Sequence, residues 1–523
     1  MNDRTELHTI ASLAENALQQ IDSLLPVGAP DTPNIDEAYR QIKAGMGSSP
    51  DIVLRRIRVP ACQPESVLVA YIDGLADTQL VEESIIAPLL QTDASPRNWS
   101  SETLLPGDIT HRGHWPGILH DLAQGRTLLF APGLDQVWSV GAVKLPQRSI
   151  GTPDTERTVR GPNEAFTEVI GTQMSQLRRE FQYPNLRFHS ITLGRLQQTA
   201  IAITYFDGLT NLDLVRSAIQ RFSHVHIDGR ATGGVLSGLI RDHPRSIFPT
   251  IRATERVDIA CQALLEGKIV ILVDGDPFVL IAPAPLVDFY RTALDYSEGW
   301  YDVSFIRILR LLAWAVGVYL PAFYIALTEV NTDLVPHALL ILTAGNHAGL
   351  PFPPMVEAIL MVFIIELLRE AALRLPKILS TTIGTVGAII VGTVVVKAGI
   401  VSPQMIVVIT LTALSFYTVP VYELTGTWRL VNLVMLVAAA IMGIYGMVLV
   451  SVWLIGALIS LDSFGAPYFE PFAPFRPGDW RDVLVRLPWT LMRRRSTTAR
   501  PLHPTWMGPS LREPPPHLKR PKP

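Results

Sequence analysis

The run FIRILRLLAWAVGVYLPAFYIAL (305–327) opens the stretch of sequence that decides the fold, which extends to residue 461. Within that stretch, apolar runs follow one another with only short polar breaks. A bilayer core of about 30 Å is crossed by roughly 20 apolar helical residues, and several of these runs are that long. Residues 301–462 therefore predict an all-α polytopic transmembrane domain.

Three later runs are also predicted to span the membrane as helices. Residues 354–374 form the second predicted span, 378–398 the third and 403–421 the fourth. Residues 334–353 are apolar but are broken by Pro and Gly, which favours a re-entrant or interfacial helix over a span.

The last apolar run, 430–461, allows two interpretations. It is either one long tilted helix or a hairpin that turns at Gly443 and Gly446. Arg307 and Arg310 at the start of the first span favour a cytoplasmic start, because basic residues stay on the cytoplasmic side. The segment after the run is also basic, so an even number of spans, and hence the hairpin, is favoured.

Charged residues inside the second span are exceptions that call for an explanation. Glu357, Glu366, Arg369 and Glu370 lie within it. Ionisable groups in membrane helices commonly mark ion paths or structural ion pairs. Glu366 and Arg369 are spaced i, i+3 and can pair. The alternatives are an ion or gating site and a structural pair near the cytoplasmic interface.

The residues before the first span predict a water-soluble α/β domain built from a duplicated unit. The runs IVLRRIRV and SVLVAYIDG are followed by a helical pattern, and NLRFHSITL, TAIAITYFDG and a second helical pattern repeat this order 134 residues later. Alternating and then 3.6-residue periods indicate strand, strand and helix. We expect two similar ββα-type subdomains.

Several local patterns in this part have simple structural interpretations. The Asp-Gly pair after each repeated strand is typical of a turn, because Gly tolerates positive φ. The run KIVILVDGDPFVLIAP predicts a hairpin around its DGDP turn. A helix is predicted from Asn163 to about Arg179, and its last residues, Arg178 and Arg179, either lie in solvent or bind phosphate.

Composition and motifs exclude several classes of protein. The net charge is −3, and the two cysteines form neither a disulfide framework nor a zinc cluster. The sequence contains no protease, hydrolase or phosphate-loop motif. We therefore expect no catalytic residues, no metal site and no cofactor, and we expect the protein not to be an enzyme. The N-terminus lacks a signal-peptide pattern, so the soluble domain is expected on the cytoplasmic side.

These observations divide the chain into five parts. The tail after the last span holds eleven Lys or Arg against four acids, which predicts a cytoplasmic contact with anionic lipid. Its Pro-rich end is expected not to fold. The predicted parts are a helical or linker segment (1–50), soluble subdomain 1 (51–150), soluble subdomain 2 (151–300), the transmembrane domain (301–462) and a basic Pro-rich tail (463–523).

The chain resembles the A subunits of the GerA family, the germinant receptors of bacterial endospores. The resemblance rests on pieces that occur in the family's order and spacing from about residue 51 to residue 495. They are VRGPNEAFTE, FPTIRATERVD, LLEGKIVILVDGDPFVLIAP, LPFPPMVEAILMVFIIELLREAALRLP, AGIVSP and SFGAPYFEPFAPFRPGDWRD.

The resemblance implies a function, partners and a location. The chain would be a receptor subunit in the spore inner membrane, with a multi-span B subunit and a lipoprotein C subunit, and would trigger germination. Its α/β domain and tail would face the spore core. The A subunit would oligomerise into a ring that opens as a nutrient-gated cation channel. The third span would line the pore, with Thr385, Val391, Val394 and Val395 as candidates.

Two alternatives stay open from the sequence. A stage V sporulation AF-type protein shares the family domain but acts as an accessory channel that amplifies ion release. A secondary transporter would show inverted repeats in the membrane part, whereas duplication is evident only in the soluble part.

Coupling of the nutrient signal to the pore is assigned to the second-span charges Glu357, Glu366, Arg369 and Glu370.

Overall fold

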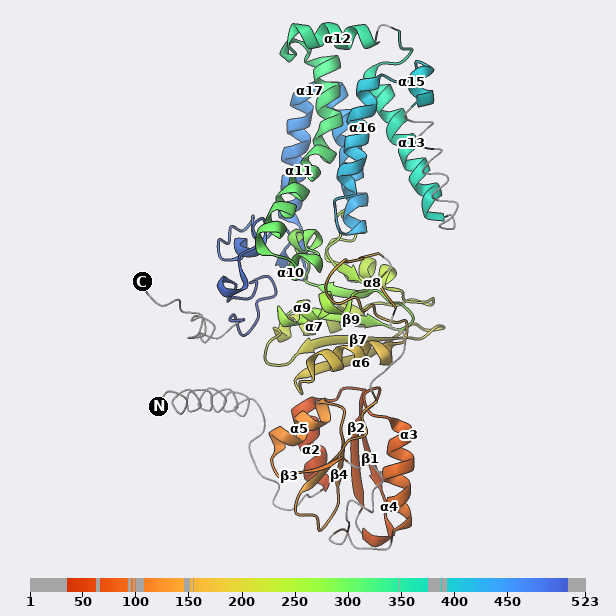
Figure 1. Ribbon diagram of the computed structural model, residues 1–523, viewed down its shortest axis with the longest axis vertical. Coiled ribbons are helices and arrows are strands. Elements are labelled where there is room, and N and C mark those ends of the chain that lie inside the picture. The colour runs from red at the N-terminus through yellow and green to blue at the C-terminus, as the bar shows by residue number, and fades with distance from the viewer. Residues whose placement is uncertain are drawn as a thin grey trace, which may run out of the picture.

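The computed structural model describes residues 35–62, 66–92, 96, 99, 108–144, 151–153, 155–347, 349–374, 387 and 393–506. Figure 1 shows two α/β subdomains stacked end to end, with a group of long helices at the opposite end from the first subdomain. Most of the predicted third span, and the tail beyond residue 506, lie outside the described residues.

Subdomain 1 is a five-stranded antiparallel sheet with helices on both faces. Its strand order is β1-β2-β4-β5-β3. Because both faces are covered, every residue of the strand β2 is buried. Its elements are α2 (Ile35–Met46), β1 (Ile52–Ile57), β2 (Val67–Ile72), α3 (Thr78–Val81), α4 (Ala87–Gln91), β3 (Ile109–Arg112), α5 (Trp115–Ala123), β4 (Thr127–Phe130) and β5 (Val137–Val140).

Helix α2 belongs to this subdomain, although it falls in the segment expected to be a separate helical or linker region. Ala38, Ile42 and Met46 follow one another at intervals of four and form a single buried face. They pack with α5 in one core cluster. The core of subdomain 1 therefore extends across the boundary predicted at residue 50, because this amphipathic face packs on the sheet.

Subdomain 2 repeats the arrangement. Its strand order, β6-β7-β9-β10-β8, corresponds strand for strand to that of subdomain 1. Helices α6 and α9 cover one face of the sheet, and α7 and α8 cover the other. Its elements are α6 (Ile170–Phe181), β6 (Leu186–Leu193), β7 (Thr199–Phe206), α7 (Leu212–Ser223), α8 (Gly233–Ile240), β8 (Arg252–Thr254), α9 (Val257–Leu265), β9 (Ile269–Val273) and β10 (Val279–Ala282).

The pairing register agrees with a duplication. Ile52 faces Ile72 in the first sheet, and Leu186 faces Phe206 in the second, each position lying 134 residues further along. Both repeated turns have a glycine with positive φ, at 84° in Gly74 and 80° in Gly208. The repeat extends beyond the predicted ββα unit, because α9 also follows α5 at a constant interval, of 142 residues.

The helix expected from Asn163 begins seven residues later, at the start of α6. The segment before it is extended, because the N–H of Phe166 donates to the carbonyl oxygen of Glu255 at 2.7 Å. A long-range backbone contact therefore replaces the expected first helical turns. Glu164 is not in a first turn and instead accepts a hydrogen bond from Gln176 at 3.0 Å.

The two arginines at the end of α6 are engaged within the protein. Arg178 is fully buried, and its Nε lies 2.8 Å from Oδ2 of Asp51 in subdomain 1. Its Nη1 donates to the carbonyl oxygen of Leu186 at 2.9 Å. Arg179 pairs with Glu164. The phosphate-binding alternative for Arg178 is therefore wrong, because this guanidinium joins the two subdomains.

The C-terminal half is helical. Two of its described helices, Trp300–Val330 and Tyr422–Ser460, are long and apolar enough to cross a membrane. The second predicted span agrees in its bounds with α13. The elements are α10 (Leu294–Ser297), α11 (Trp300–Ile325), α12 (His337–His347), α13 (Pro354–Arg374), α15 (Val395–Lys397), α16 (Pro403–Phe416) and α17 (Tyr422–Ser460).

The predicted fourth span is shorter than expected. Helix α16 has 14 residues and ends at Phe416, five residues before the predicted end at Val421. Pro420 restricts the residue before it, Val419, away from helical geometry, so the helix does not continue to Val421. In contrast, α11 begins at Trp300, before the first predicted span, because its first turns pack on the soluble domain.

Helix α17 is a hairpin of two limbs joined at Gly443. That residue has φ 61° and ψ −142°, which is not helical. Asn432 on the first limb donates to the carbonyl oxygen of Gly317 on α11 at 2.9 Å. Ser451 on the second limb lies 3.1 Å from the hydroxyl of Tyr319 on the same part of α11. The two limbs therefore run side by side in opposite directions.

Both ends of this hairpin return to subdomain 2. The hydroxyl of Thr427 donates to the carbonyl oxygen of Ile247 at 2.7 Å. That of Ser463, just after the second limb, donates to the carbonyl oxygen of Thr250 at 2.5 Å. The hairpin interpretation of the run 430–461 is therefore correct.

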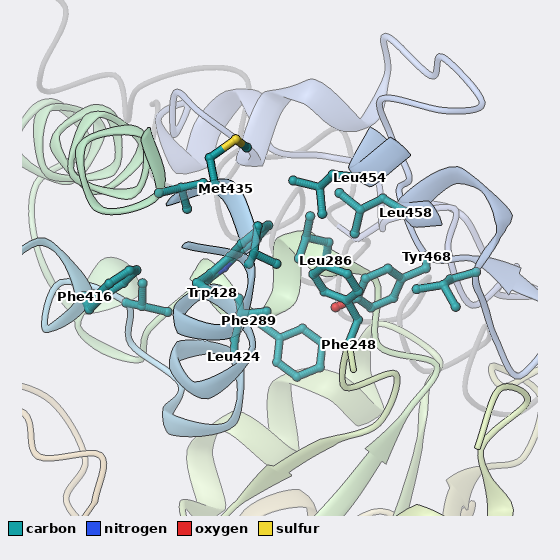
Figure 2. Packing of buried hydrophobic residues seen from close by; sticks show 14 of the residues in the cluster. Phe248, Leu286, Phe289, Phe416, Leu424, Trp428, Met435, Leu454, Leu458 and Tyr468 are labelled. Atoms are coloured by element: carbon teal, nitrogen blue, oxygen red, sulfur yellow. The ribbon is translucent and has the colours of Figure 1, made fainter. Parts of the chain in front are cut away.

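An apolar core joins subdomain 2 to the helices. Figure 2 shows Phe248, Leu286, Phe289, Trp428 and Tyr468 meeting there. The rings of Phe248 and Trp428 lie 5.5 Å apart, centre to centre, in an edge-to-face arrangement. The chain after α17 forms β11 (Asp462–Ser463) and β12 (Ala466–Pro467) and continues against subdomain 2 to residue 506.

Candidate functional site

A cluster of buried ion pairs lies where the helical half meets subdomain 2. We call it the junction cluster, and its central members come from four elements. Arg307 and Arg310 are on the first turns of α11, Asp295 is on α10, Arg291 follows a 3₁₀ turn at Leu286–Tyr290, and Asp482 ends a 3₁₀ turn in the C-terminal segment.

The distances show a connected network. Arg307 holds two carboxylates, with Nε 3.0 Å from Oδ2 of Asp295 and Nη1 2.8 Å from Oδ1 of Asp482. Arg310 approaches Oδ1 of Asp295 at 2.9 Å. The Arg307 and Asp295 side chains are 4% and 2% exposed. Breaking such a pair leaves an uncompensated buried charge, which typically costs about 3–5 kcal/mol.

The network continues into the sheet of subdomain 2. Arg291 lies 3.2 Å from Oδ1 of Asp288. Lys268, which directly precedes β9, lies 2.6 Å from Oδ2 of Asp288 and 2.8 Å from Oε2 of Glu266. A chain of alternating charges therefore links the sheet, the connector (the 3₁₀ turn Leu286–Tyr290 and Arg291), α11 and the C-terminal segment.

Electrostatics keep the two central carboxylates ionised. Burial alone would raise the pKa of Asp295, but Arg310 and Arg307 lower it below its ordinary value of 3.8. Burial also opposes ionisation of Asp482, yet Arg291 and Arg307 lower its pKa as well. Burial raises the pKa of Tyr296, which stays a phenol and donates to Oδ2 of Asp482 at 2.7 Å.

Glu357, the first of the predicted coupling charges, lies at the far end of the helical half. Its side chain is fully buried, and one oxygen accepts from the N–H of Ser402 at 2.9 Å, at the start of α16. Its other oxygen lies 3.2 Å from Nδ1 of His347 on α12, without hydrogen-bond geometry. Glu357 therefore joins α13, α16 and α12.

The other predicted charges lie nearer the middle of α13. Glu366 pairs with Arg369, as their spacing predicted, and also with Arg429 on α17 at 2.8 Å. Glu370 instead pairs with Arg374 at 2.6 Å on the exposed side of the same helix. Beside Glu366, a cavity of about 360 Å³ opens between α13, α16 and α17.

Two of the four candidate pore residues can be placed. Thr385 and Val391 lie outside the described residues. Val394 is 53% exposed, whereas Val395 is 6% exposed and packs in a core cluster with α13, α16 and α17. Among the described residues, no group of three His, Cys, Asp or Glu side chains could hold a metal ion.

A comparison with protein-family profiles identifies the family to which the chain belongs. The profile of the Bacillus/Clostridium GerA spore germination protein matches residues 40–498, which include both subdomains, the helical half and most of the C-terminal segment. The chain belongs to the GerA family. The resemblance inferred from the short sequence pieces is thereby confirmed.

Individual relatives in the GerA family are similar over almost their whole length. Spore germination protein KA of Bacillus subtilis (strain 168) is 35% identical over 469 residues, 89% of this chain and 86% of the relative. Spore germination protein B1 of the same organism is 35% identical over 460 residues, 87% and 95%. GerLA of Bacillus cereus is 31% identical over 467 residues, 88% and 95%.

One solved structure is also similar to this GerA-family chain. It is the N-terminal domain of the A subunit of the Bacillus megaterium spore germinant receptor GerK3. The match covers 50% of this chain and 98% of that one, at 30% identity and a TM-score of 0.39.

The sequence pieces that carry the GerA resemblance contact one another. FPTIRATERVD meets VRGPNEAFTE where Arg256 donates to the carbonyl oxygen of Pro162 at 2.6 Å. AGIVSP meets the α13 block where Ser402 donates to Glu357. SFGAPYFEPFAPFRPGDWRD supplies both Ser463, bonded to Thr250, and Asp482. Pieces that lie far apart in sequence therefore meet in the folded chain.

The junction cluster itself was not predicted from sequence. In the sequence, Arg307 and Arg310 indicate only the orientation of a helix, and Asp482 is only one of four acids in a basic tail. The pair of Arg307 and Asp482 spans 175 residues, so no local pattern reveals it. The available signal was the presence of two arginines at the start of an apolar helix, where each needs a carboxylate if it is buried.

Proposed function

We propose that this chain is the A subunit of a nutrient germinant receptor in the spore inner membrane, where it acts with a B subunit and a C subunit to trigger germination. The observation that carries the proposal is the GerA match across both halves of the chain. The family's relatives are spore germination proteins of similar length. The chain acts as a receptor and conducting subunit rather than as an enzyme.

The proposed topology has an even number of membrane passes. Helix α11 leaves the soluble side and α13 returns to it. The predicted third span, 378–398, is the next outward pass, α16 returns, and the two limbs of the α17 hairpin go out and back. The contacts of Thr427 and Ser463 with subdomain 2 support this count. The α/β domain and the C-terminal segment then share the side that faces the spore core.

The proposed mechanism is a homo-oligomeric ring that opens as a cation channel. The segment 378–398 supplies the pore, and the exposure of Val394 supports this assignment. Val395 packs within its own chain, so it positions the pore segment. The charges on α13, the helix that precedes that segment, contact α16 through Glu357 and α17 through Glu366, and we assign the coupling to them.

The test measures nutrient-triggered cation release from spores and from liposomes that contain the three subunits. We expect Val394→Trp to reduce release strongly. The matched control Val407→Trp changes a valine of similar exposure, 59%, on α16 and should leave release near wild type. Equal release by both variants contradicts the pore assignment. Release without the B subunit would favour an accessory channel instead.

A further inference from the structure

An apolar cavity of about 310 Å³ lies beside the junction cluster, on its membrane side. It is enclosed by the connector at Leu286–Tyr290, by α11, by both limbs of α17 and by the C-terminal segment. Leu286, Trp428, Leu454 and Leu458 supply much of its apolar lining. Figure 2 shows these four side chains converging in the core between the two halves.

The two ends of the cavity differ in chemistry. Arg291, Arg307 and Arg310 lie at the end near the soluble domain, whereas the rest of the lining is apolar or aromatic. Small-molecule sites are typically concave and apolar, with a few placed polar groups that fix orientation. A ligand that matches this cavity has a hydrocarbon part and a polar end that meets guanidinium groups.

Two buried donors on α11 lack hydrogen-bond partners. They are Nη2 of Arg307, whose side chain is 4% exposed, and Nε1 of Trp314, and both side chains line the cavity. A buried donor without a partner is destabilising, so a ligand acceptor at each would be favourable. The two residues are seven positions apart, which is about 10 Å along the helix and on the same face. The ligand therefore needs two acceptor groups at different depths.

The cavity is accessible from the outward face of the helices. Leu311 on α11 and Ile455 on the second limb of α17 belong to its lining and are 41% and 49% exposed. In the proposed topology these side chains face lipid tails. A molecule can therefore enter laterally from the bilayer, with its polar end toward the arginines.

We propose that this cavity binds one phospholipid with an anionic phosphate, which contacts Arg307 while an ester carbonyl accepts from Trp314. A hydrocarbon chain then fills the apolar part between Leu286, Leu454 and Leu458. The bound lipid packs directly on the junction cluster and makes the contact between the two halves dependent on lipid. The proposal rests on the membrane insertion proposed above, which extraction of membranes with carbonate tests separately.

The test is native mass spectrometry of the full chain in a neutral detergent, titrated with phosphatidylglycerol, with diacylglycerol of the same chains, or with the free fatty acid. A charge-assisted hydrogen bond contributes about 1.5–3 kcal/mol. We therefore expect the first phosphatidylglycerol to bind at least about tenfold more tightly than diacylglycerol, which lacks the phosphate. Equal binding of the two overturns the proposal, and so does equal binding of the fatty acid, whose single carboxylate group cannot reach both donors.

Two variants locate the site. Ile455→Phe on α17 narrows the opening of the cavity toward the lipid and should remove the tight phosphatidylglycerol site. Leu311→Phe, on α11 at the same opening, should have the same effect. Val452→Phe is the matched control, because Val452 is 64% exposed on the same limb and does not line the cavity. It should bind like wild type. Unchanged tight binding in both Ile455→Phe and Leu311→Phe overturns the assignment to this cavity.

Discussion

At the scale of single residues, Gly443 determines whether α17 is a straight helix or a hairpin. Its φ of 61° lies in the left-handed region, and a Cβ there would meet Oδ1 of Asn331 at 2.1 Å. Asn331 in turn accepts a hydrogen bond from the N–H of Ile444 at 2.9 Å. The turn therefore needs both the backbone freedom and the small size of glycine.

We expect Gly443→Ala to lower the free energy of unfolding by about 1–3 kcal/mol from backbone strain, and further because of the clash with Asn331. The measurement is the midpoint of thermal unfolding in detergent. Gly456→Ala is the control, since Gly456 is on the same helix pair and a Cβ there would meet nothing within 4 Å. If the two substitutions had equal effects, the turn would not depend on glycine.

The buried pair of Arg178 and Asp51 gives a second prediction at this scale. Arg178→Met leaves the Asp51 carboxylate buried without its partner, so we expect a loss of about 3–5 kcal/mol. Arg195→Met in the exposed pair with Asp228 should cost about 0.2–1 kcal/mol. Denaturant unfolding of the full chain, followed by a probe in subdomain 1, measures both. A small effect of Arg178→Met would mean that the subdomains are held together mainly by other contacts.

At the scale of elements, the sequence predicts an element correctly when the contacts that determine it are local. The hairpin at DGDP and the bounds of α13 could be predicted because turn residues and apolar length are local signals. The start of α6 could not, because the bond from Phe166 to Glu255 competes with a good local cap. The junction cluster could not either, because its arginines and its aspartate Asp482 are far apart in sequence.

The docking of the C-terminal segment should depend on pH. Because the folded pKa values of Asp295 and Asp482 lie below 3.8, their contribution to stability is complete above that pH. It is lost as the pH falls through the folded values, when both carboxyls become neutral and the arginines lose their partners. We expect protection of residues 461–506 from hydrogen exchange, after correction for the intrinsic rate, to stay level from about pH 6 to about pH 4 and to fall below about pH 4.

Two variants check that the junction cluster causes this loss. Asp482→Asn should reduce protection at neutral pH and flatten its pH dependence. Asp228→Asn removes a carboxylate from an exposed pair elsewhere and should leave both unchanged. A pH profile for Asp482→Asn that matched wild type would place the sensitive groups outside the cluster.

At the scale of the whole molecule, the proposed topology puts the two ends of the helices on opposite sides of the membrane. Asp213 is on α7 in subdomain 2, and Asp333 is near α12, and both are exposed. In oriented vesicles, a membrane-impermeant maleimide should label Asp213→Cys from one side and Asp333→Cys only from the other. Labelling of both from the same side would contradict the topology.

The native thiols should interfere little with this measurement. Cys62 is buried. Burial raises the pKa of Cys261, so little thiolate is present at neutral pH and its reaction with maleimide is slow. The wild-type chain, which has only the two native cysteines, gives the background labelling in the same vesicles.

The return of the α17 hairpin to subdomain 2 has a mechanical consequence. The attachments of the helices to that subdomain include three on different elements: the chain from Leu286–Tyr290 into α11, Thr427 to Ile247, and Ser463 to Thr250. A body held at one point can pivot freely, whereas one held at three cannot tilt without displacing all of them. Any rotation of the α/β domain is therefore delivered as torque to α11 and to both limbs of the hairpin together.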